Sequence, residues 1–146
     1  MNSLHLIPGS LMNSLHLTLP SKVDAIGPAM AKLGPLINKH LPGDEPSVDV
    51  ALQEALANAV IHGNHEDARK KIDVFCRIES DGTLDLIVRD QGPGFNPAAV
   101  PDPREEANLL SGHGRGIFLM RALMDDVRFE DGGRQVHMRK AKAQPI

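Results

Sequence analysis

Residues 48–60 constrain the fold more than any other part of the chain. Their apolar side chains recur at i, i+3, i+4 and i+7, which predicts a helix with one face against a core. This stripe consists of Val48, Ala51, Leu52, Ala55, Leu56, Ala59 and Val60. A polar row lies beside the stripe, because Glu54, Asn58 and His62 are spaced four residues apart. Apolar neighbours flank this row, so its carboxylate and amide need partners, unless the row is simply a helix edge that reaches water.

A second segment joins an acidic residue to two glycines. Asp90 follows the apolar run 83–89, and Gly92 and Gly94 come directly after it. Glycine allows a positive φ and a close approach to a ligand, and a carboxylate at a strand end accepts a hydrogen bond from an exocyclic amine. The segment therefore suits adenine recognition, and an ordinary glycine turn is the alternative.

A third segment places three alternating glycines, Gly112, Gly114 and Gly116, before a helical pattern over 116–123. A glycine-rich loop that opens a helix presents free backbone N–H groups and the positive end of the helix dipole to an anion such as phosphate. Arg115 is either a second phosphate ligand or a surface arginine. The spacing matches neither a Rossmann fingerprint nor a P-loop, and a flexible hinge is the alternative reading.

The rest of the pattern predicts the fold class. Strands are expected over 15–19, 71–79, 83–89, 127–130 and 135–139, and a helix over 23–39 that Pro28 and Pro35 interrupt or bend. The helix after Leu41 is expected to start near Pro46 with Asp44 or Ser47 as its cap, and to end around 62–63. This order predicts an α+β protein: a two-layer sandwich with one mixed, largely antiparallel sheet and helices on one face.

The chain of 146 residues fits one domain, which we place at 12–146. Residues 1–6, MNSLHL, recur unchanged as residues 12–17, and each copy opens with methionine. The repeat is too short for a solenoid unit. We therefore interpret residues 1–11 as a peripheral extension that arises from an alternative start or from the expressed sequence.

Composition excludes several classes of partner. The 16 Lys and Arg against 19 Asp and Glu give a formal charge of -3, which does not favour direct nucleic-acid binding. No apolar run approaches the ~20 residues that span a bilayer, so no membrane association is expected. Cys76 is the one cysteine, and no secretory signal is visible, which favours the cytoplasm. With no Trp or Tyr and only 4 Phe, aliphatic side chains would have to cover most of a bound purine.

The three segments together carry a family resemblance. They occur in the order of the N, G1 and G2 boxes, and the chain thereby resembles the Bergerat-fold ATPases, the superfamily of gyrase, histidine kinases and mismatch-repair ATPases. Within it, the short domain and the segment 58–64 are similar to anti-sigma factor serine/threonine kinases of the RsbW type. The matching positions are Glu54, Asn58, His62, Gly63, Asn64, Asp90, Gly92, Gly94, Gly112, Gly114 and Gly116.

The resemblance implies the Bergerat ATP-binding fold, with ATP and Mg²⁺ as cofactors. It makes Glu54 the general base, Asn58 the Mg²⁺ ligand beside the phosphates, and Asp90 the acceptor of the adenine amine. Gly92 and Gly94 would shape the wall of the adenine pocket. The segment 112–116 would wrap the phosphates, and residues 96–111 would form the lid.

The function that the resemblance implies is an anti-sigma regulator that phosphorylates a serine or threonine of a STAS-type anti-anti-sigma partner. A sigma factor is the implied second partner, and a homodimer the implied assembly. Two alternatives are an ATP-gated binding switch with negligible phosphoryl transfer, and a separate catalytic domain of the histidine-kinase type. The presence of Glu54 favours the enzyme.

Overall fold

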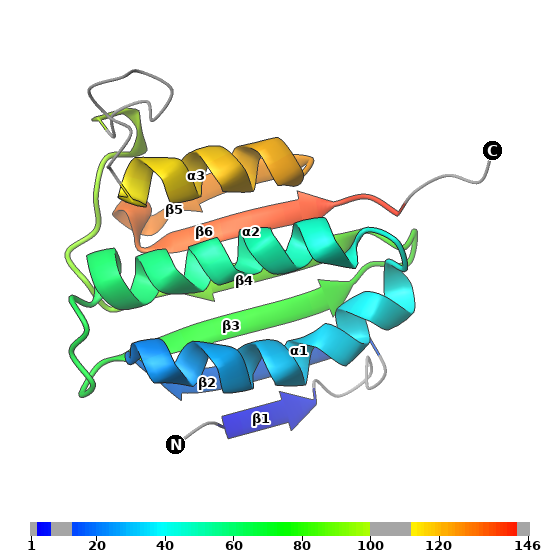
Figure 1. Ribbon diagram of the computed structural model, residues 1–146, viewed down its shortest axis with the longest axis horizontal. Helices are drawn as coiled ribbons and strands as arrows, with labels where there is room; N and C mark the ends of the chain where they lie inside the picture. The colour runs from blue at the N-terminus through cyan, green and yellow to red at the C-terminus, as the bar shows by residue number, and fades with distance from the viewer. Residues whose placement is uncertain (1–2, 7–12, 100–111, 143–146) are drawn as a thin grey trace.

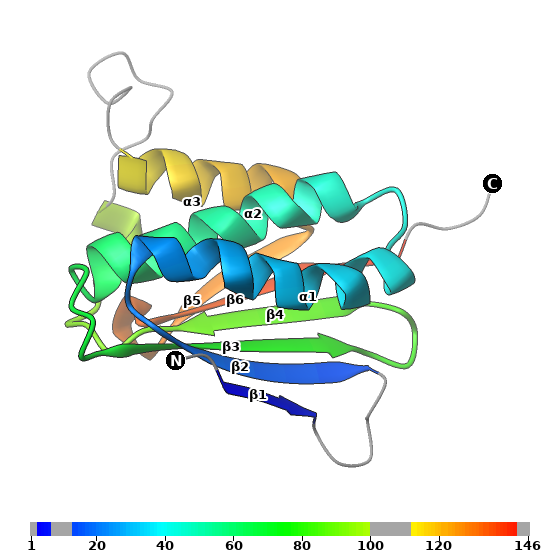
Figure 2. The same ribbon diagram turned by 60° about the horizontal axis from the view of Figure 1, so that its bottom comes forward.

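The computed structural model describes residues 3–6, 13–99 and 112–142. Its strands form one six-stranded sheet in the order β1-β2-β3-β4-β6-β5, and three helices cover one face of it (Figures 1 and 2). The elements are β1 (Ser3–Leu6), β2 (Ser14–Pro20), α1 (Ile26–His40), α2 (Glu45–Ala57), β3 (Lys71–Ile78), β4 (Leu84–Arg89), α3 (Gly112–Leu123), β5 (Asp126–Glu130) and β6 (Gln135–Lys140). The predicted α+β sandwich is confirmed, and every pair of described strands is antiparallel.

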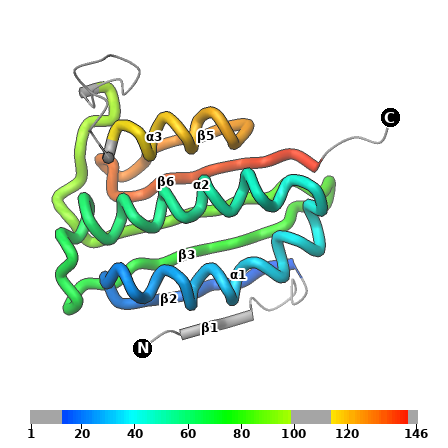
Figure 3. Tube along the Cα trace, viewed as in Figure 1, coloured from blue at the N-terminus to red at the C-terminus, as the bar shows by residue number. Residues whose placement is uncertain are grey.

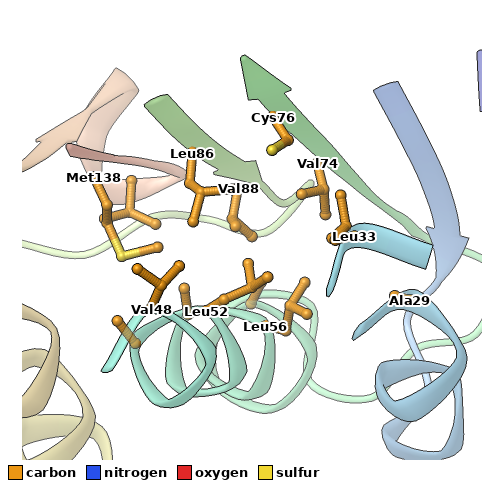
Figure 4. Close-up of a cluster of buried hydrophobic side chains, with 14 of the residues drawn as sticks. Ala29, Leu33, Val48, Leu52, Leu56, Val74, Cys76, Leu86, Val88 and Met138 are labelled. Atoms are coloured by element: carbon orange, nitrogen blue, oxygen red, sulfur yellow. The ribbon is translucent and has the colours of Figure 1, made fainter. Parts of the chain in front are cut away.

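The core lies between the sheet and the helices. Alternate residues of the central strands point toward the helices, because successive side chains of a strand lie on opposite faces. In Figure 4, Leu86 and Val88 of β4 lie opposite Leu52 and Leu56 of α2, and all four are almost completely buried. Each such side chain contributes about 1.5–3 kcal/mol of burial free energy, which fixes α2 on the sheet.

The helix α1 is continuous from Ile26 to His40, so the prolines do not break it. Pro28 stands in the first turn, where a backbone N–H has no partner within the helix. Pro35 lies inside the helix and removes one internal hydrogen bond. Packing offsets this cost, because Leu33 and Ile37 on either side of it are completely buried.

The helix α2 begins one residue before Pro46 and changes geometry at its end. Asp44 stands at the N-cap position, as one of the two predicted candidates, but its side chain makes no capping hydrogen bond. Instead, the Glu45 carboxylate accepts a hydrogen bond of 2.9 Å from the Gly43 N–H. Beyond Ala57 the chain continues through a π-helical turn, η2 (Asn58–Gly63). Such turns are rare, and they occur frequently at functional sites.

The outer face of the sheet carries a polar network. The Asp85 carboxylate, 3% exposed, accepts hydrogen bonds from His137 Nε2 at 2.8 Å and Arg139 Nε at 3.0 Å. Arg139 of β6 also bonds Glu79, the residue after β3. No helix in the described part of the chain is long and apolar enough to cross a bilayer.

Candidate functional site

A pocket, about 430 Å³ with its open mouth included, is lined by residues from the end of α2, the exit of β4 and the turn between β5 and β6. Figure 3 shows these three parts of the chain together at the left. Its lining residues are Ala55, Asn58, Ala59, His62, Gly63, Val88, Asp90, Gly94, Phe95, Met120, Phe129, Gly133, Arg134 and Val136. Of the predicted site residues, the pocket brings together Asn58, Asp90 and Gly94.

The π-helical turn sets which side chains of α2 reach this pocket. The Asn64 N–H donates to the Ala59 carbonyl at 2.9 Å, five residues back instead of four. The predicted straight row of Glu54, Asn58 and His62 therefore changes its period at Asn58. Asn58 and His62 line the pocket, whereas Glu54 lies half-buried beside it on α2.

The first and third predicted segments meet where α3 packs on α2. A Cβ atom at Gly116 would lie 3.0 Å from Glu54 Oε2 and 3.0 Å from Asn58 Nδ2. A side chain at residue 116 would therefore press on the ends of the Glu54 and Asn58 side chains, and glycine avoids this contact. The Nδ2 of Asn58 is buried and donates no hydrogen bond within the described residues. Such a buried donor beside a helix start is available to a ligand.

The segment 112–116 is helical, so the prediction of a glycine loop before the helix is wrong. Gly112 opens α3, and Gly114 and Gly116 are buried in its first turn and a half. Glycine disfavours helices, but the close packing on α2 outweighs that weak preference. The first N–H groups of α3 still have no partner within the helix and still suit an anion. Arg115 is exposed, and the predicted lid lies mostly outside the described residues.

The second predicted segment is a tight turn around a buried carboxylate. Asp90 is 9% exposed, and its Oδ1 accepts a hydrogen bond of 2.8 Å from the Gly92 N–H. Burial raises the pKa of Asp90, although the Gly92 N–H and the nearby Arg134 charge oppose the shift. A buried carboxylate that faces a pocket is a candidate for ligand recognition.

Two glycines bring the end of η2 and this turn into contact. A Cβ at Gly63 would lie 2.3 Å from Asp90 Oδ2, and one at Gly92 would lie 1.9 Å from the Gly63 carbonyl oxygen. A side chain at Gly63 would displace the Asp90 carboxylate, and one at Gly92 would require a shift of backbone. Gly94 has φ +83, which favours glycine at that position as well. The first and second segments are therefore in van der Waals contact.

Arg134, in the turn before β6, is a site residue that the sequence did not reveal. Its Nε donates to the Gly92 carbonyl at 2.9 Å, and its Nη2 donates to the Pro93 carbonyl at 3.0 Å. It thus holds the turn after Asp90 from the opposite side of the pocket. No local motif marks an arginine 42 residues away from its acceptor, so only the fold identifies it.

Asn64 is the second residue whose role the sequence did not reveal. Its side chain is buried, accepts a hydrogen bond of 2.8 Å from the Gln91 N–H, and donates one of 3.0 Å to the Lys71 carbonyl. It therefore connects the end of η2 to β3 and to the turn after Asp90. Its place in the segment 62–64 is the only signal that the sequence offers.

We expect Asn64→Ala to lower the free energy of unfolding by about 1–3 kcal/mol, because two backbone groups lose their partner. Denaturant unfolding measures this effect. The matched control is Asn38→Ala, at an exposed position of α1, which should leave stability unchanged or slightly higher. Equal stability of the two variants would contradict the role given to Asn64.

The apolar wall of the pocket includes two of the four phenylalanines. Phe95 and Phe129 pack edge to face with their ring centroids 5.3 Å apart. Val88, Val136 and Met120 complete this wall. The fold thus gathers aromatic surface at the pocket, although the chain contains little of it. A flat, apolar group with a polar edge near Asp90 fits such a wall.

Comparison with known proteins gives a match to one family model and to several named relatives. The family model for the histidine kinase-like ATPase domain matches residues 20–140. The serine-protein kinase RsbW of Bacillus licheniformis is 31% identical over 130 residues, 83% of this chain and 81% of that protein. The anti-sigma F factor of Heyndrickxia coagulans is 32% identical over 105 residues, 69% of this chain and 67% of that protein. The serine-protein kinase RsbW of Oceanobacillus iheyensis is 28% identical over 125 residues, 80% of this chain and 78% of that protein.

Proposed function

The chain belongs to the histidine kinase-like ATPase family, and on that premise we propose that it binds Mg·ATP in this pocket and phosphorylates a protein serine or threonine. The observation that carries the proposal is the convergence of the three segments. Asn58 and Asp90 line one pocket, and Gly116 lies against Glu54 and Asn58. The three segments occur in the order of the N, G1 and G2 boxes, and the first segment contacts both of the others.

Asp90 is proposed to recognise the adenine. The ionised carboxylate accepts a hydrogen bond from the exocyclic amine, while Phe95, Val136 and Met120 contact the apolar ring. Gly92 and Gly94 keep the turn free of side chains, so that the purine edge reaches the carboxylate. Asn64 and Arg134 hold this turn in place from two sides.

Asn58 is proposed to hold the metal and the start of α3 to hold the phosphates. An amide oxygen is a ligand that Mg²⁺ accepts, and it adds no charge to the site. When bound, Mg²⁺ neutralises charge on the phosphates. The backbone at the start of α3 offers N–H groups to phosphate oxygens, and Arg115 adds a positive charge nearby.

Glu54 is proposed to be the general base. It lies one helical turn before Asn58, and both side chains approach the same atom position at Gly116. A carboxylate at this place can accept the proton of a serine or threonine hydroxyl as the hydroxyl attacks the γ-phosphate. The half-exposed position of Glu54 leaves room for an acceptor from another protein.

The partners follow from the names of the relatives. Proteins similar to this chain are called serine-protein kinase and anti-sigma F factor. We therefore propose that the chain binds a sigma factor in the cytoplasm and phosphorylates a STAS-type anti-anti-sigma protein. A homodimer is the proposed assembly.

We expect Asp90→Asn to weaken ATP binding about tenfold, because a neutral acceptor forms a weaker hydrogen bond than a carboxylate. Isothermal titration with ATP and with ITP measures this: ITP has a carbonyl in place of the amine, so Asp90→Asn, whose amide can donate to that carbonyl, should bind ITP at least as tightly as the native protein does. The substitution should not lower the free energy of unfolding. The pKa of Asp90 is raised in the folded protein, so the ionised carboxylate destabilises the fold once pH rises above that pKa. In the native protein, ATP affinity should fall as pH drops through the same raised pKa. If Asp90→Asn leaves ATP affinity unchanged, Asp90 does not recognise the adenine.

The test of the whole proposal is transfer of labelled γ-phosphate from ATP to a purified STAS-domain protein. Phosphoserine or phosphothreonine on that protein is the expected product. ATP binding without any transfer would favour the alternative of an ATP-gated binding switch. Transfer to histidine would instead favour a catalytic domain of the histidine-kinase type.

A further inference from the structure

Asp90 and Arg134, which carry opposite charges, both line the candidate pocket. The Asp90 carboxylate accepts a hydrogen bond from the Gly92 N–H. The Arg134 guanidinium donates to the carbonyls of Gly92, Pro93 and Asp131. The ion pair that Arg134 makes is with Asp131, at 3.9 Å. Each charged group is thus bonded to backbone instead of to the other, and both remain able to bind a ligand.

The guanidinium of Arg134 is fixed in one orientation. Its Nε, Nη1 and Nη2 atoms donate to those three carbonyls at 2.9, 2.9 and 3.0 Å. Each terminal nitrogen carries a second N–H group, and neither of these has an acceptor within the described residues. A Cβ at Gly94, which also lines the pocket, would lie 3.5 Å from Nη1. A rigid group with available donors therefore borders the pocket.

The backbone fixes where Arg134 lies relative to Asp90. The Asp90 N–H donates to the Arg134 carbonyl at 2.9 Å. Further along the same turn, the Phe95 N–H donates to the Gly132 carbonyl at 2.8 Å. Main-chain hydrogen bonds thus join the turn after β4 to the turn before β6 at two points, and they hold the carboxylate and the guanidinium at a constant separation.

Adenine offers a hydrogen-bond donor next to acceptors. Its exocyclic amine donates, and the ring nitrogens N1 and N7 on either side of the amine accept. A carboxylate accepts and a guanidinium donates, so Asp90 and Arg134 together present the complementary pattern. A purine with a carbonyl oxygen at this ring position has an acceptor where adenine has the amine, and the carboxylate repels it.

We propose that Arg134 determines base specificity: its guanidinium donates a hydrogen bond to a ring nitrogen next to the amine that Asp90 recognises. This inference rests on the proposed binding of ATP. Asp90 by itself reads one polar group of the base, whereas the pair reads two. A site that hydrogen-bonds a polar group of its ligand rejects an analogue without that group, because the partner in the protein is then left unpaired.

The charge of Arg134 also acts on Asp90. Burial raises the pKa of Asp90, and the positive charge of Arg134 opposes this shift. Arg134 therefore favours the ionised carboxylate, which is the form that accepts a hydrogen bond from the amine.

The test combines a change in the protein with changes of single atoms in the base. In 1-deaza-ATP and 7-deaza-ATP a C–H group replaces N1 or N7, so one acceptor is lost while the amine stays. The native protein should bind one of these analogues about tenfold more weakly than ATP, and that analogue identifies the nitrogen. Isothermal titration measures the affinities. Equal binding of ATP and both analogues would overturn the proposal.

Arg134→Met removes the donor and keeps a long side chain. The variant should bind ATP at least about tenfold more weakly than the native protein does, and it should bind ATP and the identified analogue equally well. A loss that comes only from a loosened turn would weaken all three nucleotides by the same factor. The native preference for ATP would then persist, and the proposal would be wrong.

Two further variants complete the design. Arg128→Met is the matched control, because Arg128 lies on β5 outside the pocket lining and bonds Asp126, so every affinity should stay unchanged. Arg134→Lys replaces Arg134→Met if the latter does not fold. Lysine keeps the charge, but one ammonium cannot hold the turn carbonyls and the ring at once, so the preference for ATP should again be lost. A lysine variant with the full preference would contradict the role of the guanidinium.

The results distinguish this inference from the proposed function. If Asp90→Asn weakens ATP binding while the Arg134 variants keep the native preference for ATP over the analogue, only the role of Arg134 fails. If the native protein binds no ATP, the proposed function fails together with it.

Discussion

Glu54→Ala is expected to lower the rate of phosphate transfer to the acceptor protein about 10²–10⁴-fold, the usual contribution of a general base. ATP affinity should stay within about twofold, because Glu54 lies outside the pocket lining and its proposed partner is the acceptor hydroxyl. Single-turnover transfer of labelled phosphate and titration with ATP measure the two effects separately.

The matched control for Glu54 is Gln53→Ala, the preceding residue of α2, which is exposed and outside the pocket. It should leave both transfer and binding unchanged. Undiminished transfer in Glu54→Ala would mean that another group, or the substrate itself, removes the proton. A loss of ATP affinity in proportion to transfer would instead assign Glu54 to nucleotide binding.

Gly63→Ala is expected to weaken ATP binding about 100-fold. The added Cβ would lie 2.3 Å from Asp90 Oδ2, so the carboxylate has to leave its place beside the pocket. Overpacking of this kind costs up to about 3 kcal/mol, which corresponds to a factor of about 100 in affinity. Titration with ATP measures the loss, and circular dichroism verifies that the fold persists.

Gly34→Ala is the control for this substitution. Gly34 lies inside α1, and a Cβ there would meet nothing within 4 Å. Alanine is favoured over glycine in a helix interior by about 0.5–1 kcal/mol, so the control should unfold at a slightly higher temperature with ATP affinity unchanged. If Gly63→Ala and the control bind ATP with equal affinity, ATP binding does not require Asp90 in its present position.

Glu54→Ala and Gly63→Ala together separate the two ends of the proposed site. The first removes a chemical group at the phosphate end and leaves the adenine end intact. The second displaces Asp90 and leaves Glu54 in place. A kinase of the proposed kind should therefore lose turnover in the first case and nucleotide affinity in the second.

Local patterns were sufficient to predict most of the elements. The i, i+3, i+4 spacing over 48–60 predicted a helix against the core, and strands were predicted over 71–79, 83–89, 127–130 and 135–139. These strands are present as β3, β4, β5 and β6, and they form the antiparallel pairs β3–β4 and β5–β6. Alternation and helical periodicity arise from backbone geometry alone, so they are readable without the fold.

The candidate site was predictable only in part. The sequence pointed to Glu54, Asn58, Asp90 and the glycines, because glycines and polar residues in these spacings are typical of nucleotide sites. It did not reveal that the segment of alternating glycines is helical, since close packing on α2 overrides the low helical preference of glycine. It also could not reveal the π-helical turn at Asn58.

The sequence by itself determined which residues of the proposed ATP site are available and in what order they occur. Only the tertiary structure decided that Gly63 contacts Asp90, that Asn64 and Arg134 hold the turn after Asp90, and that Phe95 and Phe129 share one wall. Each of these contacts joins residues from different elements. Their distances depend on how α2, α3 and the strands pack, and no local pattern specifies that packing.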